Sequence, residues 1–131
     1  MKLLTREDIL AAHDIATERV PVPEWGGEVI VKGLSGREYD DWQRALVEGS
    51  GKKAKINLTM ARAKLCALAV VDKDNKRIFS DTDLVALNAK CSAPLARIYK
   101  VVSRLSGLDD EELEEVLKNS ETIAENVSGI D

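Results

Sequence analysis

The chain is 131 residues long, which is enough for one domain with a single hydrophobic core. Hydrophobic residues make up 44% and charged residues 32% of it, the balance of an ordinary globular protein, and no apolar run is long enough to span a bilayer. Aromatic residues account for only 4%, so the core must consist mainly of leucine, valine, isoleucine and alanine, which favours a mainly α-helical fold over a large sandwich or barrel.

A first helix is predicted from about Thr5 to His13. Its start combines a capping box with a hydrophobic staple, in which an apolar residue precedes the cap, an acid follows three positions after the cap, and a second apolar residue comes next. The same pattern recurs three times, at residues 34–39, 79–84 and 108–113. Four such starts in one short chain favour a mainly α-helical domain of about five to six helices.

A small N-terminal β-hairpin is predicted at about residues 17–34. Apolar and polar residues alternate from Thr17 to Val22 and again from Glu28 to Leu34, which is the period of a strand. The Pro-Glu-Trp-Gly-Gly sequence between them is typical of a turn. Pro21 and Pro23 confine the first strand to the edge of a sheet, because proline cannot donate to a central ladder.

Four more helices are predicted after the hairpin. The second runs from Ser35 to near Glu48 and is followed by a flexible basic loop at residues 49–55. The third, from about Asn57 to Val71, is apolar on more than one face and should be central and buried. Residues 77–79 suggest a short strand, a fourth helix is expected over 80–89, and a fifth from Ser92 to a glycine C-cap at Ser106-Gly107.

The C-terminal end is strongly acidic. From Gly107 onward the chain has nine acidic residues and one lysine, whereas residues 1–106 carry a net charge of +4. A short acidic helix is predicted from about Asp109 to Lys118, and it completes a single domain over residues 1–118. Residues 119–131 have no apolar stripe and are expected to form a flexible acidic tail. Acidic ends are often solvated and also often serve as interaction segments.

Catalytic and metal-binding chemistry has little support. His13 is the only histidine, and Cys66 and Cys91 have no paired spacing, so we interpret them as buried thiols. A zinc site needs about four ligands. The Gly49-Ser50-Gly51-Lys52-Lys53 segment lacks the glycine spacing and the Ser or Thr of a phosphate loop. We therefore expect that the protein is not an enzyme and that it binds no metal, no cofactor and no small-molecule substrate.

Several segments, in order, resemble one family. They are Leu4-Thr5-Arg6-Glu7-Asp8-Ile9, Pro23-Glu24-Trp25-Gly26-Gly27, Leu34-Ser35-Gly36-Arg37-Glu38, Leu65-Cys66-Ala67-Leu68-Ala69-Val70-Val71-Asp72, Ile78-Phe79-Ser80 and Arg104-Leu105-Ser106-Gly107-Leu108. Together they are similar to the tail assembly chaperones of long, non-contractile-tailed bacteriophages (siphophages) and related prophages. The resemblance covers roughly residues 3–117.

The resemblance implies a function and partners. Such chaperones bind the long, aggregation-prone tape-measure protein in the host bacterial cytoplasm, help to recruit major tail tube protein subunits around it, and are absent from the mature virion. Self-association into rings or spirals is also implied, and so is a longer, frameshifted product in many phages. Charged residues follow Met1–Leu4, so no signal peptide is expected, and neither is a membrane partner.

Four residues are candidates for protein interaction. Trp25 lies in the hairpin turn, where a tryptophan either folds back on the core or anchors a partner. Leu113, Val116 and Leu117 form a narrow apolar edge on the acidic C-terminal helix, whereas Trp42 is expected in the core. Two alternatives remain open: a structural head–tail or tail completion protein of the virion, and a small DNA-binding or regulatory adaptor. Nucleic-acid binding ranks behind protein binding because the basic residues are dispersed.

Overall fold

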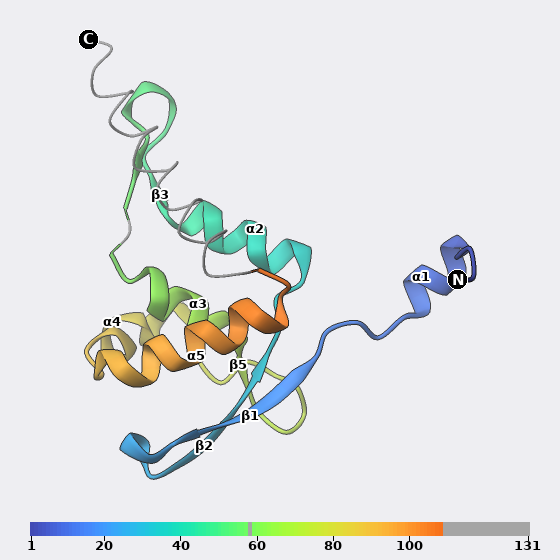
Figure 1. Cartoon of the computed structure of the whole chain (residues 1–131). Coiled ribbons are helices and arrows are strands. Elements are labelled where there is room, and N and C mark those ends of the chain that lie inside the picture. Colours follow the sequence, from blue (N-terminus) through green and yellow to red (C-terminus); the bar gives the residue numbers. More distant parts are fainter. Residues whose placement is uncertain (58, 109–131) are drawn as a thin grey trace.

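The computed structural model describes residues 1–57 and 59–108 (Figure 1). Within this range the α-helices are α1 (Arg6–Ala11), α2 (Gly36–Ala45), α3 (Ala61–Ala69), α4 (Leu84–Asn88) and α5 (Ser92–Leu105). The strands are β1 (Thr17–Val22), β2 (Gly27–Lys32), β3 (Val47–Glu48), β4 (Lys55–Ile56) and β5 (Val70–Val71). Three short 3₁₀ turns, at Pro23–Trp25, Gly51–Lys53 and Asp81–Asp83, connect some of these elements. The described part is therefore mostly α-helical, as predicted, and also contains small antiparallel sheets.

The predicted hairpin is present and belongs to a three-stranded sheet of order β1-β2-β5. β1 pairs antiparallel with β2 from Thr17 opposite Lys32 to Val22 opposite Gly27, and the Pro23–Trp25 turn joins them. β1 lies at the edge, as its prolines predicted. The third strand was not predicted, because Val70–Val71 continues an apolar run that favoured extending the third helix.

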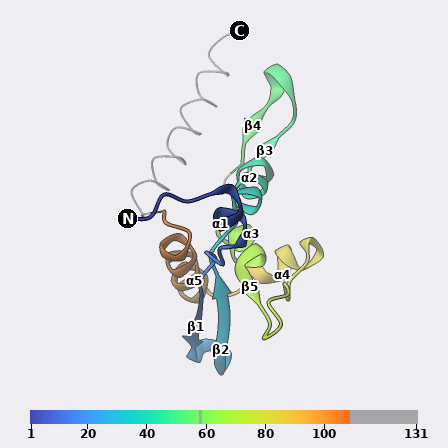
Figure 2. The ribbon, with the colours of Figure 1, turned by 90° about the vertical axis from the view of Figure 1, so that its right-hand side faces the viewer.

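α3 is the central helix, as its apolar faces predicted. Six of its nine residues are buried: Ala61, Ala63, Leu65, Cys66, Ala67 and Ala69. α2, α4 and α5 all pack against it, and α5 also covers one face of the hairpin (Figure 2). The alternating valines of β1 and β2 face this layer, and Val22 and Val31 are fully buried. The core is thus aliphatic, with Trp42 of α2 as its largest fully buried side chain.

The predicted helix caps are confirmed where the structure describes them. Thr5 and Asp8 form a capping box at α1, and Ser35 and Glu38 form another at α2. At the third start, the Ser80 N–H donates to the Asp83 carboxylate at 2.9 Å. α5 ends in a Schellman motif: Gly107 has a φ of 75°, and the Leu108 N–H bonds to the Ser103 carbonyl at 2.8 Å. The fourth start opens the predicted helix 109–118, which lies outside the described residues.

The predicted compactness of the fold is confirmed only in part, because the N-terminus lies apart from the rest. Residues 1–16, which we call the N-terminal arm, extend away from the body formed by the described residues 17–108, and no residue of α1 is buried (Figure 1). α1 has only six residues, too few to form a broad apolar face. The body is therefore compact, and the arm lies outside it.

A second correction concerns the end of α2. The helix was expected to continue to near Glu48, with a flexible loop after it, but it ends at Ala45, and β3 pairs with β4 as a short hairpin. The Asn57 N–H also donates to the Leu46 carbonyl at 2.6 Å. The basic segment is thus the turn of this hairpin, which projects from the body in both views (Figures 1 and 2).

Candidate protein-interaction site

Groups suited to catalysis are not gathered in the described part of the chain. No set of three or more His, Cys, Asp or Glu residues there could hold a metal ion. His13 is exposed beyond the end of α1. Cys66 is buried, and this burial raises the pKa of its thiol to about 12, so it is a poor nucleophile at neutral pH. Cys91 is exposed, which corrects the expectation that both cysteines are buried.

The described helices were also compared with the requirements of a membrane-spanning helix. Among residues 1–57 and 59–108, every helix is too short or too polar to cross a bilayer.

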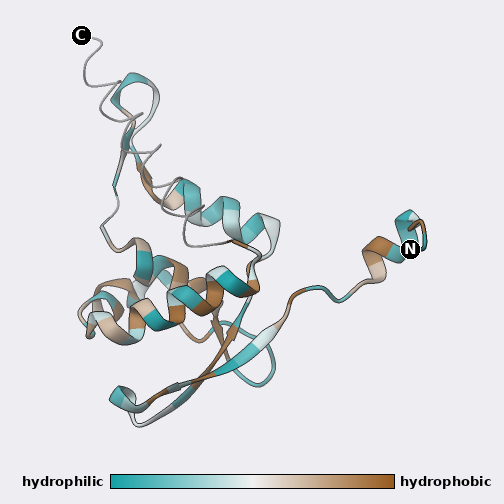
Figure 3. Ribbon diagram, in the orientation of Figure 1, coloured by the Kyte–Doolittle hydropathy of each residue, from teal (hydrophilic) through white to brown (hydrophobic). Residues whose placement is uncertain are grey.

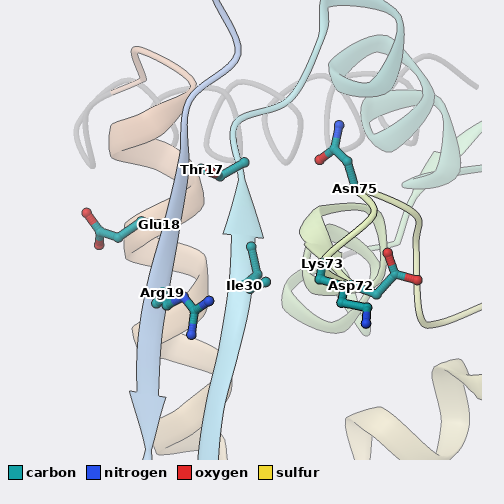
Figure 4. Close-up of a pocket in the computed structure, with 7 residues that line it drawn as sticks. All are labelled: Thr17, Glu18, Arg19, Ile30, Asp72, Lys73 and Asn75. Carbon is teal, nitrogen blue, oxygen red and sulfur yellow. The ribbon is translucent and has the colours of Figure 1, made fainter.

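A polar pocket of about 390 Å³ lies beside the sheet (Figure 4). Thr17, Arg19 and Ile30 line its sheet side, and the turn after β5 lines the other. The Asp72 carboxylate is already used by its own turn, because it accepts the backbone N–H groups of Asp74 at 2.8 Å and Lys76 at 3.0 Å. Glu18 points away from the pocket in Figure 4 and bonds Arg104 at 2.6 Å. The pocket therefore gathers no reactive constellation.

A more apolar groove of about 380 Å³ lies between α2, α3 and the start of α4. We call it the apolar groove. Its lining combines small and aliphatic residues with charged ones: Ala45, Ala67, Leu68 and Leu84, then Asp41, Lys64, Arg77 and Asp81, together with the buried Trp42. Val85, next to Leu84, is 75% exposed. Apolar residues accompanied by polar and charged ones are typical of protein-binding surfaces.

Hydrogen bonds hold two of the charged lining side chains in place. The Lys64 ammonium donates to the Ala45 carbonyl at 2.9 Å, which ties α3 to the last turn of α2. The Arg77 guanidinium donates to the Ala67 carbonyl at 2.9 Å, which ties the turn after β5 to α3. Both side chains also satisfy backbone carbonyls near helix ends, where cations are favoured. These two basic side chains are therefore preorganised, and the lining as a whole carries both signs of charge.

Trp42 is the fully buried aromatic residue among those that line the groove. Its indole N–H donates to the Ala61 carbonyl at 2.9 Å, and the side chain is fully buried. The rings of Tyr39 and Tyr99 lie 6.1 and 6.4 Å from it, within the range of favourable aromatic pairs. The expectation that Trp42 belongs to the core is confirmed. These contacts hold the Trp42 part of the groove lining in one arrangement.

The N-terminal arm is the second exposed apolar feature. Nine large apolar side chains are exposed in the described residues, and six of them lie in the arm: Met1, Leu3, Leu4, Ile9, Leu10 and Ile15. Figure 3 shows hydrophobic positions, among hydrophilic ones, on the arm outside the body. The hydrogen bonds of the Thr5–Asp8 capping box and the ion pair of Lys2 with Asp8 all lie within the arm. The arm is thus locally ordered but displays its apolar residues.

Of the candidate residues predicted from sequence, only Trp25 belongs to the part of the chain that the structure describes. Trp25 is half-buried and packs against the core from the hairpin turn, and it does not line the groove. Leu113, Val116 and Leu117 lie outside the described residues. The groove was missed because its lining comes from three helices and a turn that have no common spacing in the sequence. The arm could have been noticed in the sequence. It contains six large apolar residues, and a helix as short as α1 cannot bury all of them.

Comparisons with known proteins point to one family. A family model described as "Phage tail assembly chaperone" matches residues 5–119. The solved structure of the tail assembly chaperone of bacteriophage HK97 resembles this chain with a TM-score of 0.55 and 22% sequence identity, over 76% of this chain and 90% of that one. At that identity the likeness shows a shared fold. A comparison with curated protein sequences found no match.

Proposed function

The chain belongs to the phage tail assembly chaperone family, and from this membership we propose that it binds the tape-measure protein, keeps it soluble and helps to recruit tail-tube subunits during assembly. The complex forms in the cytoplasm of the host bacterium, and the chaperone leaves before the virion is finished. Its role is binding, without catalysis and without a cofactor. Copies of the chain also self-associate into rings or spirals.

The apolar groove is the observation that carries this proposal. A long amphipathic helix, such as a tape-measure protein contributes, presents apolar residues three and four positions apart along one stripe. The groove lies between helices, and its lining combines aliphatic residues with Lys64, Arg77, Asp41 and Asp81. Such a surface receives one helical stripe in the helix-in-groove mode of recognition.

Mass action explains how binding would keep the client soluble. Aggregation of a long helical protein depends on the concentration of its free, exposed apolar stripe. A chaperone that occupies the stripe lowers that concentration and stabilises the soluble form. Trp25, Leu113, Val116 and Leu117 remain proposed secondary contacts, with Trp25 limited to the part of its ring that the core leaves exposed.

Replacement of Ala45 by arginine tests the groove. Ala45 is exposed at the end of α2, so the Ala45→Arg variant should fold and fill the groove with a charged side chain. We expect co-expressed tape-measure protein to be soluble and bound to the wild-type chain, but to aggregate with the variant. Ala93→Arg is the matched control, because Ala93 is also exposed and does not line the groove. Pull-down followed by size-exclusion chromatography with light scattering measures the complex.

Three outcomes would count against the proposal. A tape-measure protein that stays insoluble with the wild-type chain would remove the chaperone role. The chain found by mass spectrometry in purified virions would favour a structural component. Tight, salt-dependent binding to duplex DNA would favour the DNA-binding adaptor, since phosphate contacts weaken with added salt.

A further inference from the structure

We propose that the β3–β4 hairpin, residues 47–56, is a binding site for an acidic polypeptide segment, and that its occupant is the chain's own C-terminal segment, residues 109–131. We call this hairpin the basic hairpin. The contact is intramolecular and electrostatic. It involves no tape-measure protein, so it stands or fails independently of the proposed function.

Three lysines are gathered at the tip of the basic hairpin. Lys52 and Lys53 belong to its 3₁₀ turn, and Lys55 begins β4. All three are exposed, and the hairpin that carries them projects from the body (Figures 1 and 2). Like charges placed this close together repel one another, so an anionic partner stabilises such a cluster.

The described residues supply no acid for these lysines. No ion pair within residues 1–57 and 59–108 involves Lys52, Lys53 or Lys55. Glu48 lies opposite Lys55 in the strand register, but its carboxylate accepts the Asn57 side-chain amide at 2.6 Å. The basic hairpin therefore carries positive charge that the described part of the chain leaves uncompensated.

A second turn with two lysines shows the contrast. Lys73 and Lys76 lie in the turn after β5 and are also exposed. The same turn contains Asp72 and Asp74, so its acids and bases balance. It is the natural control for the basic hairpin, because it presents lysines without an excess of positive charge.

Backbone contacts fix the shape of the turn that carries the lysines. The Lys53 N–H donates to the Ser50 carbonyl and the Ala54 N–H to the Gly51 carbonyl, both at 3.2 Å. Gly49 has a φ of 81°, and a Cβ atom there would stand 2.8 Å from the Lys53 carbonyl oxygen, so the close approach requires glycine. A turn with a fixed shape loses little conformational freedom when it binds a partner.

The C-terminal segment has the matching charge. Residues 109–131 contain nine acidic residues and one lysine, a net charge of −8. Each ion pair between exposed side chains is weak on its own. The segment is tethered to the hairpin through the chain, however, and a short tether gives an effective concentration of about 1 mM. Several weak pairs are then enough to keep the segment bound.

The segment also begins within reach of the basic hairpin. The Leu108 N–H donates to the Ser103 carbonyl at 2.8 Å, and Ser106 accepts the Leu34 N–H at 2.9 Å, so the described chain ends beside the start of α2. α2 has ten residues, a length of about 15 Å, and the basic hairpin follows its other end. The 23 residues from 109 to 131 can span about 35 Å even at the rise of an α-helix, and about 75 Å when extended.

Zero-length cross-linking of the wild-type, full-length chain tests the contact. A water-soluble carbodiimide joins a lysine to a carboxylate when the two are in contact, and mass spectrometry of the peptides identifies the pair. At low salt we expect Lys52, Lys53 or Lys55 to be joined to acids of residues 109–131. In about 1 M salt, where the Debye length falls to about 3 Å, these links should largely disappear. Equal yields of links from Lys73 and Lys76 to the segment would overturn the proposal.

Isotope mixing separates a contact within one chain from a contact between two chains. Unlabelled chains and heavy-isotope-labelled chains are unfolded, mixed and refolded together before cross-linking. A contact within one chain joins peptides that carry the same label, whereas a contact between chains also joins labelled to unlabelled peptides. We expect links of the first kind. Mixed links at the frequency of random pairing would overturn the intramolecular contact.

Removal of the lysine charges gives a second, independent measurement. The Lys52→Gln/Lys53→Gln/Lys55→Gln variant changes exposed residues only, so the body should fold. We expect a glutamate-specific protease to cut the C-terminal segment about threefold faster or more in this variant, the scale of losing three exposed ion pairs. Lys73→Gln/Lys76→Gln is the matched control and should be cut at the wild-type rate.

Two results of these variants would overturn the proposal. One is a C-terminal segment that is cut equally fast in the hairpin variant and in the wild type. The other is binding of duplex DNA that the hairpin variant loses and the control variant keeps, because it would assign the three lysines to phosphate groups of a nucleic acid.

Discussion

Gly33 shows how a single residue sets the junction between the hairpin and the helical layer. It lies between β2 and α2, where the end of α5 passes close to the backbone. A Cβ atom at this position would stand 2.8 Å from the Leu105 carbonyl oxygen and 3.1 Å from its carbon. Beside it, the Leu34 N–H donates to the Ser106 hydroxyl at 2.9 Å. The two Ser-Gly segments that mark the sequence thus meet at one backbone crossing.

The crossing gives a prediction for Gly33→Ala. We expect it to lower the free energy of unfolding by about 1–3 kcal/mol, because backbone atoms of α5 must move to admit the methyl group. Urea unfolding measures the change. Gly36→Ala is the matched control, since nothing lies within 4 Å of its added Cβ. It should be neutral or stabilise α2 by up to about 1 kcal/mol. Equal effects of the two substitutions would contradict the packing at Gly33.

At the scale of elements, ion pairs hold α5 against the hairpin. The Arg97 guanidinium bonds both oxygens of Glu24 at 2.9 and 2.8 Å, and Arg104 bonds Glu18. The first pair joins the turn of the hairpin to the first half of α5, and the second joins β1 to its last turn. Such paired bonds fix orientation as well as adding attraction. The two ion pairs thus fix the position of the hairpin relative to α5, the helix that covers it.

The Glu24–Arg97 pair predicts a pH dependence of stability. Its hydrogen bonds lower the pKa of Glu24 from 4.5 to about 2. A carboxylate with a lowered pKa in the folded state stabilises that state above its unfolded pKa, and the contribution disappears as pH falls from about 4.5 towards 2. Glu24→Gln should therefore melt below the wild type at neutral pH, and the gap in Tm should close over this window.

A thermodynamic cycle isolates the pair from other carboxylates. Arg97→Gln should also lower Tm. The double variant should lower Tm by less than the sum of the two single variants, because both remove the same pair. A gap between wild type and Glu24→Gln that is constant down to pH about 2 would contradict the lowered pKa.

Some element boundaries were mispredicted because pairing with distant strands, and not the local sequence pattern, determines where a helix ends. The capping boxes predicted helix starts well, because all the groups involved lie within six consecutive residues. The ends of α2 and α3 were predicted too late. Val47 and Val70 leave the helical path to pair with β4 and β2, and those partners lie 9 and 39 residues away in sequence. Periodicity within a segment carries no information on such partners.

The whole molecule combines a packed body with an arm that does not contribute to it. Ile98→Ala, at a fully buried position of α5, should lower the free energy of unfolding by about 2–5 kcal/mol through the cavity it leaves. Ile9→Ala, the same substitution in the arm, should change it by less than about 0.5 kcal/mol in dilute, monomeric protein. Urea unfolding at low concentration measures both. A large effect of Ile9→Ala there would mean that the arm packs on its own body.

The sequence by itself determined the class of the fold, the hairpin with its edge strand, the central helix and the caps, because these follow from periods and capping groups within short segments. It also placed the chain in its family through an ordered set of short motifs. Only the tertiary structure decided that α1 stands outside the body, that Val70–Val71 is a strand, and that Ala45, Leu68 and Leu84 line one groove. These depend on which distant segments meet, and side chains from separate helices share a surface without sharing any spacing along the chain.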